Sequence, residues 1–265
     1  MSTILFTAAQ HATHSHQHPE HAGRIDAIMA AIATDTACAP IYAEVTPVPM
    51  NVVNAVHPQS HIDWVQTQSI QARTVPMLDG DTYIQPGTAH AAHLAASAAC
   101  HAIDAIVGGH TPFALTRPPG HHATATQSMG FCFYNNVAVA ARYAQHAHGI
   151  RRIAIVDIDV HHGNGTDDIF REDPEVLYVS THGWPLYPGS GARDSFGSGA
   201  GYGTTLNIPI PAQSGDSAFL HVYQNLVIPA LERFKPELVL VSAGFDAHWD
   251  DPLGNCRLSV TGYLD

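Results

Sequence analysis

The chain of 265 residues is long enough to bury a large core and fits one large α/β domain or two small ones. Its formal net charge of −12 argues against direct binding of nucleic acid, because an acidic surface is repelled by phosphates. Such a surface would instead attract cationic partners such as lysine-rich tails or polyamines.

Neither the amino terminus nor the hydropathy of the chain indicates secretion or membrane insertion. The first ten residues lack the charged region of a signal peptide, and no apolar run approaches the roughly 20 residues of a membrane span. The cysteines show no CxxC spacing; they are Cys38, Cys100, Cys132 and Cys256. These features predict a cytoplasmic protein with reduced thiols and no membrane association.

Short apolar runs alternate with helical stretches along the chain. Strands are predicted at residues 4–8, 113–116, 153–157, 176–180, 205–209 and 238–243. Helices are predicted at residues 89–107, 136–147 and 218–234. Strands separated by helices indicate an α/β fold with an open, mostly parallel, doubly wound sheet and helices on both faces. Such sheets bind ligands at the carboxyl ends of their strands, where polar clusters occur here.

Residues 258–265 have the pattern of a helix start, with Thr261 as the N-cap. A single helical turn is not stable by itself. We therefore expect a longer protein to continue beyond Asp265.

Two of these polar clusters contain candidate metal ligands. Asp159 and His161 are two residues apart after an apolar run, so they point to the same side of an extended segment. Asp246 follows another apolar run. Two Asp and one His leave a fourth position for water, which is typical of catalytic zinc. An Asp-x-Asp at a strand end can also be a simple cap or turn former.

Candidate proton-transfer residues lie in the same clusters. The pair His121 and His122 has the chemistry for proton transfer, although a His-His pair alone is more often structural. Asp157 and Asn164 are candidates for the acceptors that orient these two rings. Because several such clusters each follow a predicted strand, a functional site is favoured over separate structural roles.

Four motifs together resemble the histone deacetylase superfamily. They are Arg117-Pro-Pro-Gly-His-His-Ala, Gly130-Phe-Cys-Phe-Tyr-Asn-Asn, Asp157-Ile-Asp-Val-His-His-Gly-Asn-Gly-Thr and Ser242-Ala-Gly-Phe-Asp-Ala. Asn164 and the segment Asp79-Gly-Asp-Thr-Tyr are more similar to the class II and bacterial amidohydrolase branch. The resemblance extends from His18 to Gly262.

This resemblance implies an arginase-like and deacetylase-like α/β fold, with residues 1–265 as a single deacetylase domain that lacks its C-terminal segment. It also implies a zinc hydrolase that removes acetyl groups from amines. Asp159, His161 and Asp246 match the Zn²⁺ ligands. His122 matches the general base and acid, and His121 the neighbouring electrostatic His.

The resemblance also implies residues that orient the two histidines and residues that bind monovalent cations. Asp157 matches the residue that orients His121, and Asn164 would orient His122. A K⁺ site is matched by Asp157, Ser180 and Thr181, together with backbone oxygens of Asp159 and His161. A second K⁺ or Na⁺ site is matched by the carbonyls of Phe170, Asp173 and Val176.

The substrate is expected to enter a narrow tunnel. Phe131 and Tyr187 match its aromatic walls, Gly130 its floor, and Arg24 an Arg beside an internal acetate cavity. Acetylated lysine peptides, acetylated polyamines and other small acetylated amines all suit this tunnel. The sequence does not choose among them and leaves the oligomeric state open.

The sequence departs from the family pattern in one respect. The family uses a Tyr in a Gly-Gly-Tyr loop as an oxyanion donor, and these 265 residues contain no such loop, because Tyr263 lies in another context. A non-catalytic homologue that binds acyl-lysine and metal is therefore the first alternative. The second is a manganese ureohydrolase-like enzyme, which would need further Asp ligands.

Five His residues crowd one amino-terminal segment, namely His11, His14, His16, His18 and His21. A surface metal-binding tract is one interpretation. A loop at the rim of the site is the favoured one.

Overall fold

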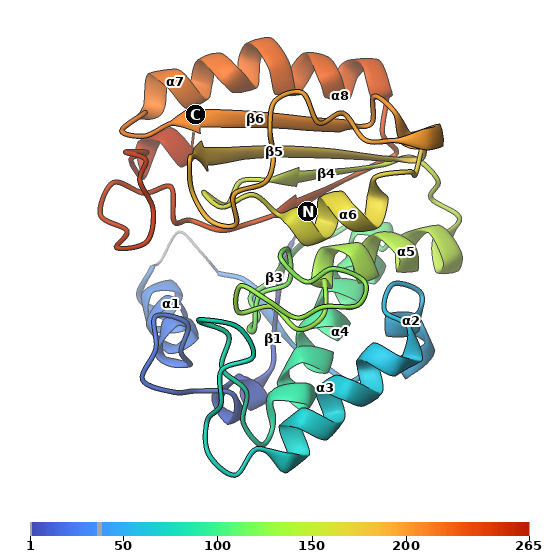
Figure 1. The fold of residues 1–265 in the computed structure, drawn as a ribbon, viewed down its shortest axis with the longest axis vertical. Helices are drawn as coiled ribbons and strands as arrows, with labels where there is room; N and C mark the ends of the chain where they lie inside the picture. The colour runs from blue at the N-terminus through green and yellow to red at the C-terminus, as the bar shows by residue number, and fades with distance from the viewer. Residues whose placement is uncertain (1, 36–38, 265) are drawn as a thin grey trace. The chain divides into compact units, whose positions relative to one another are not determined.

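The computed structural model describes residues 2–35 and 39–264, so Cys38 lies outside the described residues. The chain divides into two compact units, Met1–His148 and Gly149–Asp265. Each unit contains its own parallel sheet (Figure 1), which confirms the predicted α/β class. Within the described ranges, no helix is both long and apolar enough to cross a bilayer.

The first unit has a three-stranded sheet in the order β2-β1-β3. Its strands are β1 (Thr3–Thr7), β2 (Ile41–Glu44) and β3 (Thr111–Ala114). Its helices are α1 (Gly23–Thr34), α2 (Met50–Asn54), α3 (Gln59–Gln71), α4 (Thr88–Val107) and α5 (Asn136–His148), with a 3₁₀ turn, η1, at Ala9–Thr13. The predicted strands at 4–8 and 113–116 correspond to β1 and β3. The short and mostly exposed β2 was not predicted.

Helix α4 is the longest element of this unit. Its alanines favour the helical conformation, and most of their small side chains are buried against neighbouring segments. Leu94 and Ala98 pack against β1, while Ala92, Ala96 and Cys100 pack with Phe133 and Val139. The helix therefore supports the segment from β3 to α5, which carries His121, His122 and Phe131.

The second unit has a four-stranded sheet in the order β6-β5-β4-β7. Its strands are β4 (Ile153–Asp157), β5 (Val176–Trp184), β6 (Thr205–Pro211) and β7 (Leu238–Ser242). Helix α6 (Asn164–Phe170) connects β4 to β5, and α7 (Asp216–Val222) and α8 (Ile228–Phe234) connect β6 to β7. The 3₁₀ turns η2 and η4 lie at Gly199–Gly201 and Thr261–Tyr263. All five residues of β4 are buried, as expected of an inner strand in a parallel sheet.

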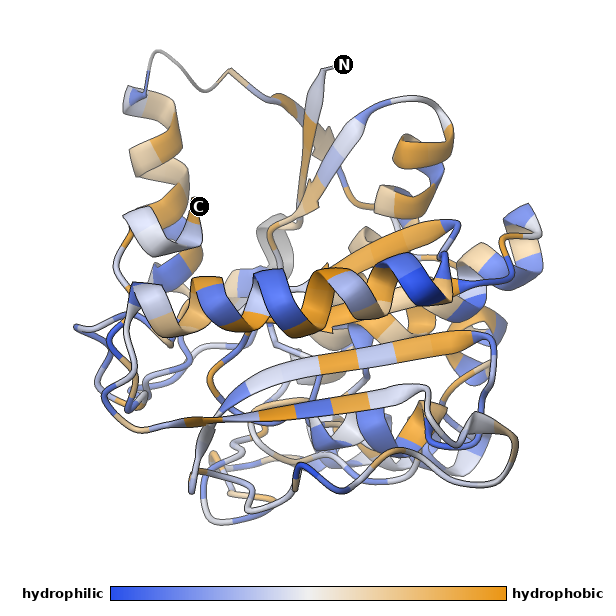
Figure 2. Cartoon of the chain, turned by 90° about the horizontal axis from the view of Figure 1, so that it is seen from above, coloured by the Kyte–Doolittle hydropathy of each residue, from blue (hydrophilic) through white to orange (hydrophobic). Residues whose placement is uncertain are grey.

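The helix predicted at residues 218–234 is present but interrupted. Residues Tyr223–Val227 form a π-helical segment, η3, between α7 and α8. Hydrophilic and hydrophobic residues alternate along this helical stretch (Figure 2), which buries Phe219 and Val227 in the core of the unit. The π segment also carries Tyr223, whose hydroxyl lies 3.2 Å from the Thr181 hydroxyl of β5.

The prediction of Thr261 as a helix N-cap is wrong. Thr261 is instead the first residue of the 3₁₀ turn, and Val260 precedes it without a side-chain cap. Ser259, two residues before Thr261, caps this turn instead, because its hydroxyl accepts the Gly262 N–H at 3.1 Å. The Ser259 hydroxyl is itself held by Asp216 of α7 at 2.7 Å.

The register of the second sheet determines where its polar strand ends meet. Asp157 at the end of β4 is paired with Ser180 of β5 on one side and with Ser242 of β7 on the other. The loops that leave β4 and β7 therefore begin side by side. These are the loops that carry the predicted metal ligands.

Candidate active site

Three predicted ligands converge at the carboxyl ends of β4 and β7. One donor atom from each of Asp159, His161 and Asp246 can be chosen so that all lie within 4.8 Å of one another. Asp159 and His161 follow β4 by two and four residues, and Asp246 follows β7 by four residues. Within the described residues, this is the one group of three His, Cys, Asp or Glu side chains close enough to hold a metal ion.

Backbone amides orient both carboxylates of this group. Asp246 Oδ1 accepts the Val160 N–H at 2.8 Å, and Asp159 Oδ1 accepts the His161 N–H at 2.8 Å. The Nδ1 atom of His161 lies 3.1 Å from Asp159 Oδ1 and 2.9 Å from Asp246 Oδ2. The backbone of the loop thus orients the three side chains toward one another.

The electrostatics of this group favour a cation. Burial alone would lower the pKa of His161, but hydrogen bonds to Asp159 and Asp246 outweigh it and raise that pKa to about 10. Burial and then the neighbouring Asp159 charge raise the pKa of Asp246 to about 6. Two carboxylates in a confined space therefore stabilise positive charge between them. A divalent ion bound by the same atoms would supply that charge.

Two glycines leave room for the side chain of Asp159 and for the backbone of Asp246. A Cβ at Gly244 would lie 1.9 Å from Asp159 Oδ2, and a Cβ at Gly254 would lie 1.9 Å from the backbone oxygen of Asp246. Neither glycine could become alanine without moving a ligand residue. Gly244 and Gly254 are thus part of the local geometry of the group.

The predicted potassium residues lie in the strands beneath it. Asp157 is fully buried, accepts the Tyr178 hydroxyl at 3.1 Å and accepts the Asp159 N–H at 3.3 Å. Ser180 and Thr181 are buried in β5; the Ser180 hydroxyl lies 2.9 Å from His182 Nδ1.

The other predicted residues of this unit occupy the ends of α6 and the start of β5. Asn164 is the first residue of α6. Phe170 is its last residue, Val176 begins β5, and Asp173 lies between them, with its N–H donated to the Phe170 carbonyl at 2.9 Å.

The aromatic ring of Tyr187 approaches the ligand group. Its centroid lies 6.3 Å from that of His161 in an edge-to-face arrangement, and the residue is 44% exposed. Two buried histidines that sequence reasoning did not assign to the site hold the loop that follows Tyr187. His162 Nδ1 lies 2.8 Å from the Ser190 hydroxyl, and His182 Nε2 lies 2.9 Å from the Gly191 carbonyl.

In the first unit, His121 and His122 lie in the segment after β3. Both are buried, and their ring centroids are 3.9 Å apart. Gly130 packs directly on the second ring, because a Cβ there would lie 2.4 Å from His122 Cδ2. The next residue, Phe131, has a positive φ of 69°. The structure therefore gathers four of the predicted residues of this unit in one place.

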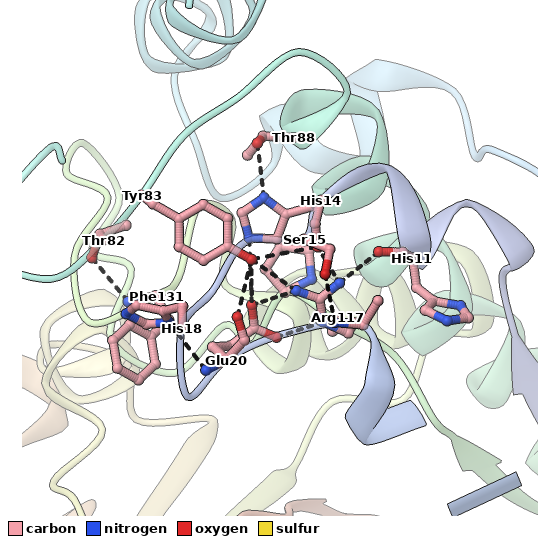
Figure 3. Close-up of polar contacts among 12 residues, drawn as sticks. His11, His14, Ser15, His18, Glu20, Thr82, Tyr83, Thr88, Arg117 and Phe131 are labelled. Atoms are coloured by element: carbon pink, nitrogen blue, oxygen red, sulfur yellow. Dashed lines mark hydrogen bonds and ion pairs between the residues drawn. The ribbon is translucent and has the colours of Figure 1, made fainter. Parts of the chain in front are cut away.

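A buried network of charged and polar groups lies close to Phe131 and was not predicted. Arg117 donates from Nε and Nη2 to the two carboxylate oxygens of Glu20 at 2.7 and 2.6 Å (Figure 3). The Tyr83 hydroxyl and the backbone carbonyl of His14 also contact this guanidinium. Burial would raise the pKa of Glu20, but hydrogen bonds from His14 and Arg117 lower it to about 2. Glu20 is therefore a buried carboxylate that stays charged.

The amino-terminal histidines are divided between this network and the surface. His14 is buried and stacks on Tyr83 at 4.4 Å, and the side chain of His18 is 5% exposed. These two residues form part of the packing instead of a surface metal tract. Arg24, on the first turn of α1, is largely exposed, and its Nη1 lies 3.8 Å from Glu20 Oε1.

Comparisons with known proteins agree on one family. The family model described as the histone deacetylase domain matches residues 18–265. Histone deacetylase 14, chloroplastic, of Arabidopsis thaliana is 47% identical over 191 residues, which cover 69% of this chain and 45% of that protein. The polyamine deacetylase HDAC10 of Rattus norvegicus is 44% identical over 215 residues, which cover 76% of this chain and 36% of that protein.

A solved structure also matches nearly the whole chain. The crystal structure of the HDA15 HD domain has a TM-score of 0.92 and 39% sequence identity over 99% of this chain and 77% of that one. The chain spans about half the length of the curated relatives it matches first.

Proposed function

The chain belongs to the histone deacetylase family, and we propose that it is a zinc-dependent hydrolase that removes acetyl groups from lysine side chains or small aliphatic amines. The observation that carries this proposal is the convergence of Asp159, His161 and Asp246. Two carboxylates and one imidazole suit Zn²⁺, and three protein ligands leave a position for water or substrate. Zinc, when bound, would polarise the acetamide carbonyl and lower the pKa of a water molecule.

The chain's own residues would divide the remaining work. We assign proton transfer to His122, first from the water and then to the leaving amine, because an imidazole titrates near neutral pH. His121, whose ring is 3.9 Å away, would tune it electrostatically. Asp157 and Asn164 would orient the two rings through hydrogen bonds.

The aromatic residues would select the substrate. Phe131 and Tyr187 would form the walls of a tunnel for a slim aliphatic arm, and Gly130 would form its floor. The exposure of Tyr187 next to His161 supports this assignment. Arg24 would lie beside the cavity that receives acetate, and its position next to Glu20 gives it a nearby anionic partner.

Monovalent cations would support the strands below. Asp157, Ser180 and Thr181 are proposed for a K⁺ site, and the carbonyls of Phe170, Asp173 and Val176 for a second K⁺ or Na⁺ site. The register that pairs Asp157 with Ser180 supports the first of these sites.

The substrate would be an acetylated lysine peptide or an acetylated polyamine. One relative is named as a histone deacetylase and another as a polyamine deacetylase, so both classes occur among similar proteins. The acidic charge of the chain suits either cationic substrate. Residues 1–265 would act as one deacetylase domain, which is supported by a family match that runs through both units, and we expect a cytoplasmic location.

Metal content and turnover test the proposal together. We expect about one zinc per chain, and release of acetate from an acetyl-lysine peptide or acetylputrescine that a hydroxamate inhibits. Asp246→Asn should lose both zinc and turnover, while Asp250→Asn, at an exposed position without a proposed role, should keep both. Zinc and hydroxamate binding without turnover, also in a protein extended past Asp265, would favour the non-catalytic binder.

A manganese ureohydrolase is the third outcome. Such a site needs carboxylates for a second ion, whereas the described part of the chain contains one group of three candidate ligands. Two manganese ions per chain with urea release would overturn the deacetylase proposal.

A further inference from the structure

We propose that Asp79 and Thr82 are positioning residues for the substrate tunnel: they hold the Gly130–Phe131 turn in a strained conformation that fixes the direction of the Phe131 ring. This inference rests on the proposed function, because it gives Phe131 its role as a tunnel wall. In this proposal Asp79 and Thr82 act through Phe131 and do not contact the substrate themselves.

The turn that carries Phe131 is unusual for its residues. Met129 and Cys132 pair across it, with N–H···O distances of 3.1 and 2.9 Å. Gly130 and Phe131, at its centre, have φ values of 55° and 69°. A two-residue turn with two positive φ values strongly prefers Asn-Gly or Gly-Gly. Phe at the second position is therefore strained, and other contacts must hold it.

The segment Asp79–Thr82 supplies those contacts. The Gly130 N–H donates to Asp79 Oδ2 at 3.2 Å, and the Phe131 N–H donates to Thr82 Oγ1 at 2.9 Å. The Thr82 hydroxyl in turn donates to Asp79 Oδ2 at 3.0 Å. Two consecutive amides of the strained turn are thus bound by two side chains from a distant segment.

Asp79 is itself fixed by its own loop. Its Oδ1 accepts the N–H groups of Asp81, at 2.8 Å, and of Thr82. Burial would raise the pKa of Asp79, but these bonds and those of Thr82 and Gly130 lower it, so the acceptor stays charged. The Met77–Tyr83 bridge closes the loop, and Tyr83 is anchored by its hydroxyl to the Glu20 carbonyl at 3.0 Å.

The ring of Phe131 is restrained at its face as well as at its backbone. The His18 ring meets it edge to face, with centroids 4.8 Å apart (Figure 3). His18 is held in turn, because its Nδ1 accepts the Glu20 N–H at 3.0 Å and its Nε2 lies 3.0 Å from Asp81 Oδ1. The loop Asp79–Thr82 thus contacts the backbone of Phe131 directly, and it restrains the ring of Phe131 indirectly through His18.

A stability role alone does not account for this arrangement. Glycine at position 131 would remove the strain and the need for the Thr82 acceptor, but it would also remove the ring. The sequence instead has an aromatic side chain at this position, and the Thr82 hydroxyl and the Asp79 carboxylate hold it. Strained residues held in this way occur preferentially at binding and catalytic sites.

Variants of Thr82 test the proposal in the zinc-loaded chain. Thr82→Val keeps the shape of the fully buried side chain and removes the acceptor, whereas Thr82→Ser keeps the hydroxyl. Thr34→Val, which removes an exposed hydroxyl at the end of α1, is the control. Two quantities are measured: hydrogen exchange of the Gly130 and Phe131 amides, and the affinities of a hydroxamate with a long aliphatic arm and of acetohydroxamate, which lacks the arm.

We expect Thr82→Val to speed exchange of the Phe131 amide and to weaken the long-arm hydroxamate about tenfold, as when a buried N–H loses its acceptor. Acetohydroxamate affinity should stay within about twofold, and Thr82→Ser and Thr34→Val should resemble the parent chain. Unchanged hydrogen exchange in Thr82→Val would refute the idea that Thr82 holds the Gly130–Phe131 turn. Equal losses of affinity for both hydroxamates would refute the positioning role. A parent chain that binds both hydroxamates without hydrolysing acetylated amines would contradict the proposed hydrolase, while these affinities would still decide the inference.

Discussion

Replacing Gly244 with alanine should disable the metal group through sterics alone. The new Cβ would lie 1.9 Å from Asp159 Oδ2, 2.5 Å from its Cγ and 2.8 Å from its Cβ. Rotating the Asp159 side chain can clear the first two contacts but not the third, because the Cβ of Asp159 does not move when its side chain rotates. The backbone of one of the two loops therefore has to shift.

The distance by which Asp159 must move determines the expected loss of zinc affinity. The Cβ and Oδ2 atoms must separate by about 1.5 Å to reach an ordinary contact of 3.4 Å. Functional metal sites tolerate about ±0.2 Å in ligand distance. Asp159 would thus leave the ligand set, and we expect zinc affinity to fall about 100-fold or more, given that disturbing even outer-shell partners costs 10–100-fold.

Competition against a chromophoric chelator measures this affinity. Gly108→Ala is the matched control, since the atom nearest to its new Cβ would be the Ala105 carbonyl oxygen at 3.3 Å and its φ of −74° suits alanine. The thermal midpoint of both metal-free proteins shows whether the fold is retained. A Gly244→Ala protein that binds zinc as tightly as the parent would refute the ligand assignment of Asp159.

Three further predictions concern buried groups. Burial lowers the pKa of His57 to about 4, so the folded state disfavours its charged form; stability should be full above pH 6.5 and fall by up to about 3 kcal/mol as the pH drops to 4. Urea titrations across this range give the free energy of unfolding at each pH, and His57→Gln should reduce its dependence on pH. An unchanged pH dependence would show that His57 is not its origin. Glu20→Gln should lower the free energy of unfolding by about 3–5 kcal/mol, and combining it with Arg117→Met should recover part of that loss; a purely additive double variant would show that the pair is not coupled. Gly191→Ala, whose Cβ would lie 2.6 Å from two histidine rings at a φ of 87°, should cost about 3 kcal/mol by the same assay, and a change below about 0.5 kcal/mol would sink this reasoning.

The sequence was sufficient to predict the group of Asp159, His161 and Asp246, because the signals for these residues are local. Asp159 and His161 are adjacent to a continuous apolar strand, and Asp246 follows another such strand. Parallel strands bring their carboxyl ends to one edge, so the two loops had to lie near each other once β4 and β7 were neighbours. The prediction that these three residues form one group is confirmed.

The buried network could not be found in this way. Arg117 and Glu20 are 97 residues apart, and neither is part of a pattern that indicates burial. The same holds for the positive φ of Phe131, since a Gly-Phe pair is not a recognised signal for such a turn. Both features arise from contacts between distant segments, which local propensity does not report.

Secondary structure shows the same division. The long apolar strands and the Ala-rich helix were predicted within a few residues. The strand β2 was missed because its four residues are mostly exposed and do not alternate. The π segment in the helix at 218–234 was missed because a shift in backbone hydrogen bonding leaves little trace in side-chain type.

The ion pair between Arg117 and Glu20 also constrains how this protein can change over generations. A domain of ordinary stability has about 5–15 kcal/mol to lose, and removal of either charge alone takes about 3–5 kcal/mol of it. Lineages that lose one partner would therefore be removed by selection before the second could follow, unless the rest of the chain had gained stability beforehand. We expect the two positions to vary together among descendants of this sequence, so that natural variation records the contact.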